Sequence, residues 1–276
     1  MTTTLVSVPR DVAALEDWRF SVDMEGIAWA VFDRAGESAN ALGRRSLEEL
    51  FAIIERVETG AKDGSIRGLV LISGKEKGFI VGADVREFDQ LQSEAQVIDA
   101  IQPVNAMLDR LERMPVPVVA AIHGVCVGGG LELALACHYR IATRDDSTRV
   151  GFPEVKLGIF PGFNGTARSI RQAGPLVAMQ AMLTGSMIRA TAARAQGLID
   201  ELVDSPGQLR WHARRAILQN RKSKPAPFQK SVLAKWPARG YLAEKMRGET
   251  RKKVREEHYP APFRLIELFQ RHGGDL

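Results

Sequence analysis

Two glutamates and a glycine triplet lie near the middle of this 276-residue chain. Gly128, Gly129 and Gly130 follow an apolar, β-branched run and precede an apolar helical pattern, so they mark a sharp turn from a strand into a helix. Glycine adopts backbone angles closed to other residues and leaves its amide groups accessible, and amides at a helix start suit an anion. Glu132 follows two residues after the triplet, and Glu154 follows a second short apolar run. The sequence therefore predicts a site with two carboxylates and a loop of amide donors.

Apolar strands and amphipathic helices alternate in the chain that positions these residues. Strands are predicted over residues 27–34, 66–73 and 116–122. The second of these is almost continuously apolar, as expected when both faces of a sheet are covered. Apolar residues at helical spacing predict helices over residues 46–58 and 95–113. This alternation predicts an α/β layered fold with crossover connections.

The composition is that of a globular protein. With 45% hydrophobic residues, the chain can bury a large core and suits one sizeable domain plus an appendage. No apolar run approaches the roughly 20 residues that span a bilayer, and the N-terminus lacks the apolar segment of a secretory signal, so we expect a cytoplasmic protein. Cys126 and Cys137 lie in apolar stretches, which predicts buried free thiols, and zinc-ligand spacings are absent.

The net charge of +5 is unevenly distributed along the chain. Residues 1–209 carry 21 Lys and Arg against 27 Asp and Glu, whereas residues 210–276 carry 17 against 6. This change lies close to a candidate boundary at residues 204–207, so we expect a core domain over residues 1–204 and a basic helical appendage over residues 205–276. Beyond Gly165, helices are predicted over residues 176–183, 190–196, 209–220, 241–257 and 263–271, with a turn at 259–262.

Three motifs, in this order, resemble the crotonase superfamily and, within it, enoyl-CoA hydratase. They are FIVGADVREF (79–88), AAIHGVCVGGGLELALACHYRIAT (120–143) and FPEVKLGIFPGFNGTAR (152–168). The resemblance covers about residues 20–204 and implies a crotonase-like (ββα) spiral core with a helical C-terminal appendage. EHYPAPFRLIE (257–267) resembles the linker of multifunctional fatty-acid oxidation α-subunits, in which a 3-hydroxyacyl-CoA dehydrogenase follows the hydratase/isomerase domain. No strand followed by GxGxxG occurs here, so we expect an N-terminal piece of a longer protein.

The resemblance implies that the chain hydrates a trans-2-enoyl-CoA to a 3-hydroxyacyl-CoA in β-oxidation, with Δ3–Δ2 isomerisation as a side activity. By this resemblance, Glu132 orients and deprotonates the water and Glu154 delivers a proton to the α-carbon. Close carboxylates titrate as a coupled pair, so these acid and base labels can exchange. The backbone amides of Ala83 and Gly129 are expected to form the oxyanion hole, and the amide of Gly162 is expected to help hold the attacking water.

The resemblance also implies how the substrate is held. Ala39 and Ala41, in the ANAL segment, and Asp84 and Gly128, beside the donor amides, are expected to contact the acyl-CoA thioester. Asp84 is further expected to help hold the donor loop. Coenzyme A is part of the substrate, so no separate cofactor and no metal are expected. The expected partners are a dehydrogenase domain or a thiolase subunit, and further copies of the chain in a homo-oligomer.

The same residues can also be interpreted as structural residues without a catalytic role. Glu132 is favoured in a first helical turn by the helix dipole, Glu154 could be a solvated loop carboxylate, and the glycines could serve only a tight turn. His123 is expected to be a packed histidine. Two features also depart from single-domain hydratases: Glu132 and Glu154 are two residues further apart, and Asn164 stands where glycine is commoner. The first predicts a longer surface loop, and the second affects the pocket beside Gly162.

A second class of function is a nucleic-acid-binding or scaffold protein built on a crotonase core. Such binding would weaken steeply with salt. Few aromatic residues are interleaved with the basic ones, which argues against stacking on single-stranded nucleic acid, and no nucleic-acid partner is expected. The cations that could neutralise phosphates are Lys222, Lys224, Lys230, Arg247, Arg251, Lys252, Lys253 and Arg255.

Overall fold

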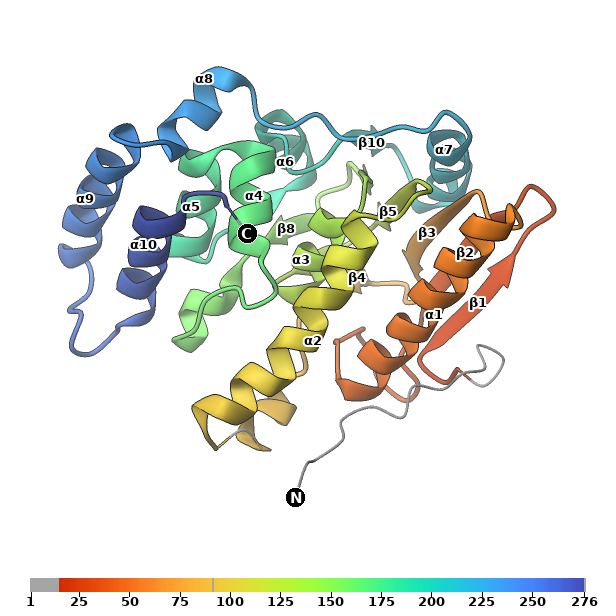
Figure 1. Cartoon of the computed structure of the whole chain (residues 1–276), viewed down its shortest axis with the longest axis horizontal. Coiled ribbons are helices and arrows are strands. Elements are labelled where there is room, and N and C mark those ends of the chain that lie inside the picture. The colour runs from red at the N-terminus through yellow and green to blue at the C-terminus, as the bar shows by residue number, and fades with distance from the viewer. Residues whose placement is uncertain (1–14, 91, 276) are drawn as a thin grey trace.

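The computed structural model describes residues 15–90 and 92–275 as a mixed α/β structure (Figure 1). The strands are β1 (Trp18–Val22), β2 (Ile27–Phe32), β3 (Gly68–Ser73), β4 (Gly78–Ile80), β5 (Val118–Ile122), β6 (Val125–Val127), β7 (Tyr139–Thr143), β8 (Arg149–Gly151), β9 (Met187–Arg189) and β10 (Glu201–Val203). The α-helices and the short 3-10 helices (η) are α1 (Arg44–Asp63), η2 (Val85–Gln90), α2 (Glu94–Glu112), α3 (Gly129–Ala136), η3 (Pro153–Leu157), α4 (Gly165–Ala173), α5 (Pro175–Thr184), α6 (Ala190–Gln196), α7 (Pro206–Leu218), α8 (Phe228–Ser231), η4 (Val232–Ala234), α9 (Ala238–Arg251) and α10 (Ala261–His272). The predicted α/β fold class is confirmed.

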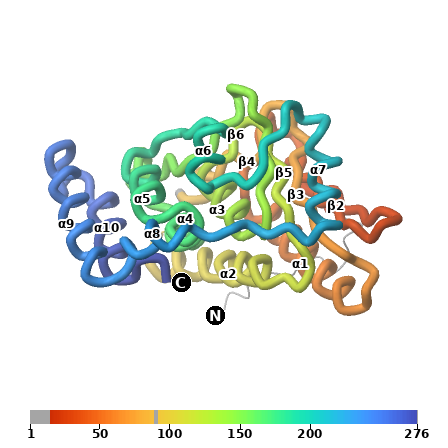
Figure 2. Tube along the Cα trace, turned by 90° about the horizontal axis from the view of Figure 1, so that it is seen from above, coloured from red at the N-terminus to blue at the C-terminus, as the bar shows by residue number. Residues whose placement is uncertain are grey.

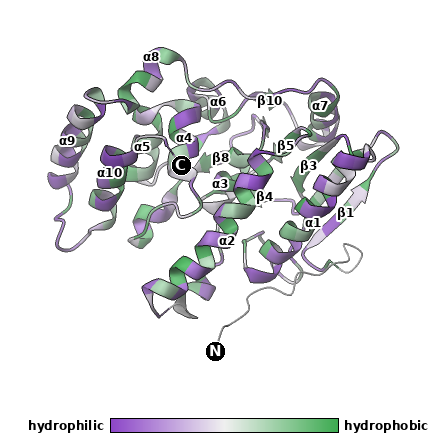
Figure 3. Ribbon diagram, in the orientation of Figure 1, coloured by the Kyte–Doolittle hydropathy of each residue, from purple (hydrophilic) through white to green (hydrophobic). Residues whose placement is uncertain are grey.

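The larger sheet has six strands in the order β1-β2-β3-β5-β7-β10, and only its β1–β2 pair is antiparallel within the described residues. Side chains alternate between two buried faces along β3. Leu69 and Leu71 belong to the main core, whereas Val70 and Ile72 pack in a second cluster with α7. Both faces are covered, which explains the continuous apolar run of this strand. Figure 3 shows β3 and β5 in the hydrophobic colour.

The smaller sheet has four strands in the order β4-β6-β8-β9. β4, β6 and β8 run parallel to one another, and β9 closes the sheet in the antiparallel sense. Each of these strands is three residues long, which is too short for a periodic pattern to predict. This sheet carries the candidate site.

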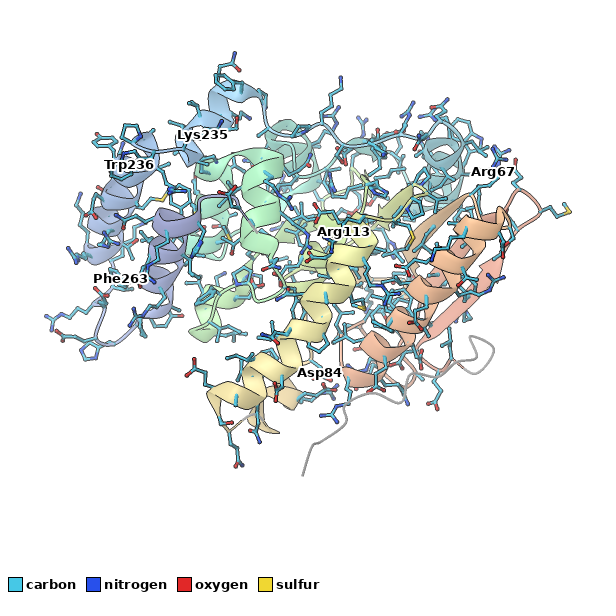
Figure 4. The ribbon with its side chains drawn as sticks, in the orientation of Figure 1. Arg67, Asp84, Arg113, Lys235, Trp236 and Phe263 are labelled. Carbon is cyan, nitrogen blue, oxygen red and sulfur yellow. The ribbon has the colours of Figure 1, made fainter. Side chains whose placement is uncertain are left out.

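The C-terminal helices pack onto the rest of the molecule. α10 contacts both α9 and α5, and Figures 1 and 2 both show α9 and α10 beside α5, at the opposite end from β1. Leu265, Ile266 and Phe269 of α10 are buried in the same core as the strands, while Trp236 lies at the outer surface (Figure 4). The Tyr259 hydroxyl donates a hydrogen bond to the carbonyl of Val155 in η3. The C-terminal region therefore touches the turn that carries Glu154.

The structure changes some of the predicted element boundaries. The predicted helix 241–257 is observed as α9, which ends at Arg251, and turns follow it. α4 was not among the predicted helices, and it begins at Gly165, inside the third motif. Within the described residues, no helix has both the length and the hydrophobicity needed to cross a bilayer.

Candidate active site

The residues that follow three parallel strands of the smaller sheet lie at one edge of that sheet. β4, β6 and β8 are neighbours that run parallel, so their C-terminal ends lie together. The chain after β4 carries Ala83, the chain after β6 carries Gly129, and η3, which follows β8, carries Glu154. α3 begins after β6 and adds Glu132 in its first turn. The topology therefore collects at one place four residues that are up to 71 positions apart in the sequence.

The amides of Ala83 and Gly129 lie side by side. A Cβ added at Gly129 would lie 3.4 Å from the Ala83 nitrogen and 3.0 Å from the Phe163 ring. Gly129 is the first residue of α3, so its N–H has no acceptor inside the helix. Neither N–H donates a backbone hydrogen bond to another residue that the structure describes. Two free donors this close together can bind an oxygen on which negative charge develops.

Glu132 is buried, with an exposed fraction of 2%. Its Oε1 accepts hydrogen bonds from the N–H groups of Phe163 and Gly165, both at 2.8 Å. Burial raises the pKa of the Glu132 carboxyl above its ordinary 4.5, and the charge of Glu154 raises this pKa further, while the two N–H donors oppose the rise. The two carboxyls are therefore coupled, because the charge of Glu154 disfavours ionisation of Glu132.

Glu154 lies in η3, and its carboxyl group has no hydrogen-bond partner in the described part of the chain. Both of its oxygens are buried and accept no hydrogen bond within the described residues. Burial raises the pKa of this carboxyl above 4.5. A Cβ at Gly128 would lie 3.2 Å from Glu154 Oε1, and Gly128 has a positive φ of 54° that glycine favours. N–H groups of two other residues lower the pKa of Glu132, whereas the N–H that lowers the pKa of Glu154 is its own, and burial raises the pKa of both carboxyls.

The raised pKa of Glu154 predicts a pH-dependent difference in stability between the protein and its Glu154→Gln variant. The folded protein binds this proton more tightly than the unfolded chain, whose carboxyl has a pKa of 4.5. The free energy of unfolding therefore falls as pH rises above that value, by up to about 1.4 kcal/mol for each pH unit of the shift. Urea unfolding of both proteins at about pH 5 and about pH 8 checks this, because the variant should lose less stability between these values. Equal losses would contradict a raised pKa at Glu154.

Asp84 holds the loop that carries the Ala83 amide. Its side chain is 6% exposed, and its Oδ2 lies 2.8 Å from Arg34 Nη1. Arg86 donates from Nε to Asp84 Oδ1 at 2.8 Å. The hydrogen bond from Arg86, with a further contribution from Arg34, keeps the pKa of Asp84 far below its usual range. Figure 4 places Asp84 near the N-terminal end of α1, where the Asp84 N–H donates to the Leu42 carbonyl.

The ANAL segment runs beside this loop. The Leu42 N–H donates to the Gly82 carbonyl at 2.8 Å, and Leu42 forms a parallel bridge with Ala83. Asn40 is buried and donates from Nδ2 to the carbonyls of Phe32 and Phe79. It therefore fixes the segment on which Ala39 and Ala41 lie half-buried. The motif alone predicts substrate contacts for Ala39 and Ala41, and it predicts no role for Asn40 between them.

The segment from Gly162 to Gly165 faces Glu132. The Gly162 carbonyl accepts a hydrogen bond from Asn105 Nδ2 at 3.2 Å, whereas the N–H groups used by Glu132 come from Phe163 and Gly165. Asn164 has a φ of 60°. After glycine, asparagine is among the residues that best tolerate this left-handed conformation, which explains how it can replace a glycine here.

Other residues singled out in the sequence lie in packed surroundings. His123 Nε2 lies 2.7 Å from the carbonyl oxygen of Lys75. Cys126 and Cys137 are buried free thiols. Within residues 15–90 and 92–275, no three His, Cys, Asp or Glu side chains are grouped as metal ligands.

The chain is similar to proteins of one known family. The profile of the family described as enoyl-CoA hydratase/isomerase matches residues 23–238. Proteins named fatty acid oxidation complex subunit alpha are similar: the one from Shewanella sp. (strain MR-4) is 38% identical over 248 residues, and the one from Vibrio cholerae is 37% identical over 259. These matches cover 88% and 92% of this chain but 34% and 36% of the relatives, so the chain spans about a third of their length.

Solved structures are also similar. The enoyl-CoA hydratase of Bacillus anthracis has a TM-score of 0.65 and 28% identity, and the match covers 91% of this chain and 89% of that structure. An enoyl-CoA hydratase/carnitine racemase from Magnetospirillum magneticum has a TM-score of 0.68 and 27% identity, covering 88% of this chain and 85% of the other.

Proposed function

This chain belongs to the enoyl-CoA hydratase/isomerase family, and from that premise we propose that it adds water across the 2,3 double bond of a trans-2-enoyl-CoA. The resemblance to the crotonase superfamily and the crotonase fold are thereby confirmed. The observation that carries the proposal is the buried Glu154 carboxyl, which has no hydrogen-bond partner among the described residues and is coupled to Glu132, together with two amides that are free among the same residues. An unpartnered buried carboxyl is costly to maintain, so its presence supports a role with a bound ligand.

The proposed mechanism assigns each group a step. The thioester oxygen accepts hydrogen bonds from the backbone N–H groups of Ala83 and Gly129. These two bonds stabilise the negative charge that develops on the oxygen. Glu132 takes a proton from the water as the water oxygen bonds to C3, and Glu154 gives its proton to C2. The product is a 3-hydroxyacyl-CoA, and passage of one proton from Glu132 to Glu154 restores the pair. The N–H donors on Glu132 support its role as the ionised base.

Neither a redox step nor a separate cofactor enters this reaction. Coenzyme A is part of the substrate, and the half-buried Ala39 and Ala41 lie on the segment proposed to contact it. Moving a double bond from C3 to C2 needs the same removal and return of protons beside a stabilised thioester oxygen. We therefore also propose Δ3–Δ2 isomerisation as a side activity of this pair.

The wider role follows from the relatives. The match to the protein named fatty acid oxidation complex subunit alpha covers 88% of this chain and 34% of that protein, so the relative is more than twice as long as this chain. We propose that the chain acts in β-oxidation in the cytoplasm, together with a dehydrogenase domain or a thiolase subunit, and as a homo-oligomer. The nucleic-acid alternative accounts for neither the paired carboxyls nor the free amides.

Hydration of short, medium and long trans-2-enoyl-CoA substrates tests the proposal. Chromatographic measurement of 3-hydroxyacyl-CoA should show product from at least one chain length, at a rate that depends on that length because the acyl chain must be held beside the carboxyl pair. Control reactions with the matching saturated acyl-CoA should give none. Failure to form product from every enoyl-CoA would remove the hydratase assignment.

A further inference from the structure

Arg168 is a buried cation close to the carboxyl pair. It lies on α4, and its side chain is 1% exposed. Its guanidinium makes three separate hydrogen bonds. Nε donates to Glu112 Oε2 at 3.0 Å, Nη2 donates to Asp109 Oδ1 at 2.6 Å, and Nη1 donates to the Phe163 carbonyl at 2.8 Å. A guanidinium bonded through all three of its nitrogens is fixed in orientation, so it holds its partners in place as well as supplying a positive charge.

The third of these bonds reaches the segment that holds Glu132. Phe163 accepts from Arg168 with its carbonyl and donates with its own N–H to Glu132 Oε1. Gly165 supplies the second donor. The segment approaches Glu132 so closely that a Cβ at Gly165 would lie 2.5 Å from Glu132 Cγ. A small displacement of Phe163 would therefore disturb the carboxylate directly.

The acidic anchors of Arg168 lie on another helix. Asp109 and Glu112 belong to α2, as does Asn105, which donates to the Gly162 carbonyl. α2 thus holds this segment at two successive carbonyls, through Asn105 directly and through Arg168. The N–H groups on the other side of the segment are left for Glu132.

We propose that Arg168, anchored by Asp109 and Glu112, is a positioning residue for Glu132. It holds the Phe163 carbonyl and thereby the segment 163–165, so that the two N–H donors meet the carboxylate in the orientation that receives a proton from water. This inference rests on the proposed function, since it assigns Glu132 the role of base.

The charge of Arg168 adds a readout that a merely structural role would not affect. The groups that act on the Glu132 carboxyl are Glu154 from η3, the two N–H donors from residues 163 and 165, and Arg168 from α4. Arg168 lowers the pKa of Glu132, against the effects of burial and of Glu154. Loss of the positive charge should therefore raise that pKa and keep the base protonated to higher pH.

Two substitutions separate charge from geometry. Arg168→Met removes both the charge and the hydrogen-bond geometry. We expect kcat for enoyl-CoA hydration to fall by about 10²-fold, the cost typical of a displaced catalytic group. The acidic limb of the kcat–pH profile should also move to higher pH. Arg168→Lys keeps the charge without that geometry, so kcat should recover in part and the limb should stay where it is in the unsubstituted protein. KM should change much less than kcat in both. Arg171→Met is the control, because Arg171 also bonds Glu112 but is 43% exposed.

The outcomes are distinct. Unsubstituted kcat and an unshifted profile for folded Arg168→Met would overturn the positioning role, and so would an equal loss in Arg171→Met. If Arg168→Met does not fold, Asp109→Asn carries the test: a fall in kcat with little change in KM supports the role, and an unchanged kcat overturns it. Lack of hydration by the unsubstituted protein would instead overturn the proposed function.

Discussion

Replacing Glu154 by Gln is expected to lower kcat for enoyl-CoA hydration by about 10³-fold, within the range typical of a lost acid or base. Gln keeps the size of the side chain but cannot deliver a proton to C2. Both Glu154 oxygens are buried without partners in the described structure, so the substitution breaks no hydrogen bond between described residues and the fold should remain. Product formation and circular dichroism of the purified variant measure the two effects separately.

The matched control for this experiment is Glu256→Gln. Glu256 has a side chain that is 55% exposed and lies 3.9 Å from Arg251, on the C-terminal side of α9. The same chemical change there should leave kcat within about twofold, because a surface pair of this kind contributes little. A folded Glu154→Gln variant with kcat equal to that of the control would remove Glu154 from the mechanism.

The second large effect is expected from Gly129→Ala. The new methyl group would lie 3.4 Å from the Ala83 nitrogen and 3.0 Å from Phe163 Cε2, in the space between the two donor amides. It would displace the thioester oxygen, and loss of one oxyanion donor typically costs about 10²–10³ in kcat. We expect kcat to fall by that factor. Steady-state rates with the best enoyl-CoA substrate measure it.

Backbone strain does not confound this substitution. Gly129 is the first residue of a helix and does not have a positive φ. Gly248→Ala in α9 is the control, since a Cβ there meets nothing within 4 Å and alanine favours a helix interior. This control should keep full activity and gain a little stability. Unchanged kcat in folded Gly129→Ala would show that the oxyanion does not bind between these amides.

Much of the architecture followed from local patterns. The predicted strand 116–122 and helix 95–113 agree with β5 and α2 to within two residues, because each has enough residues to show its period. The strands of the smaller sheet have three residues each, so no period distinguishes them from loops. Their pairing depends on hydrogen bonds between segments far apart in the sequence, which no local pattern predicts.

The sequence by itself determined the family, through three motifs, and it singled out Glu132, Glu154, Ala83 and Gly129. Only the tertiary structure decided that these residues meet, and that Phe163 and Gly165 donate to Glu132 while Glu154 has no partner among the described residues. It also revealed Arg168, whose importance no spacing predicts because its three acceptors come from α2 and from the segment before α4. Residue types decide which groups can exchange protons. The pKa and the direction of each group depend on burial and on hydrogen-bond partners, which long-range packing alone supplies.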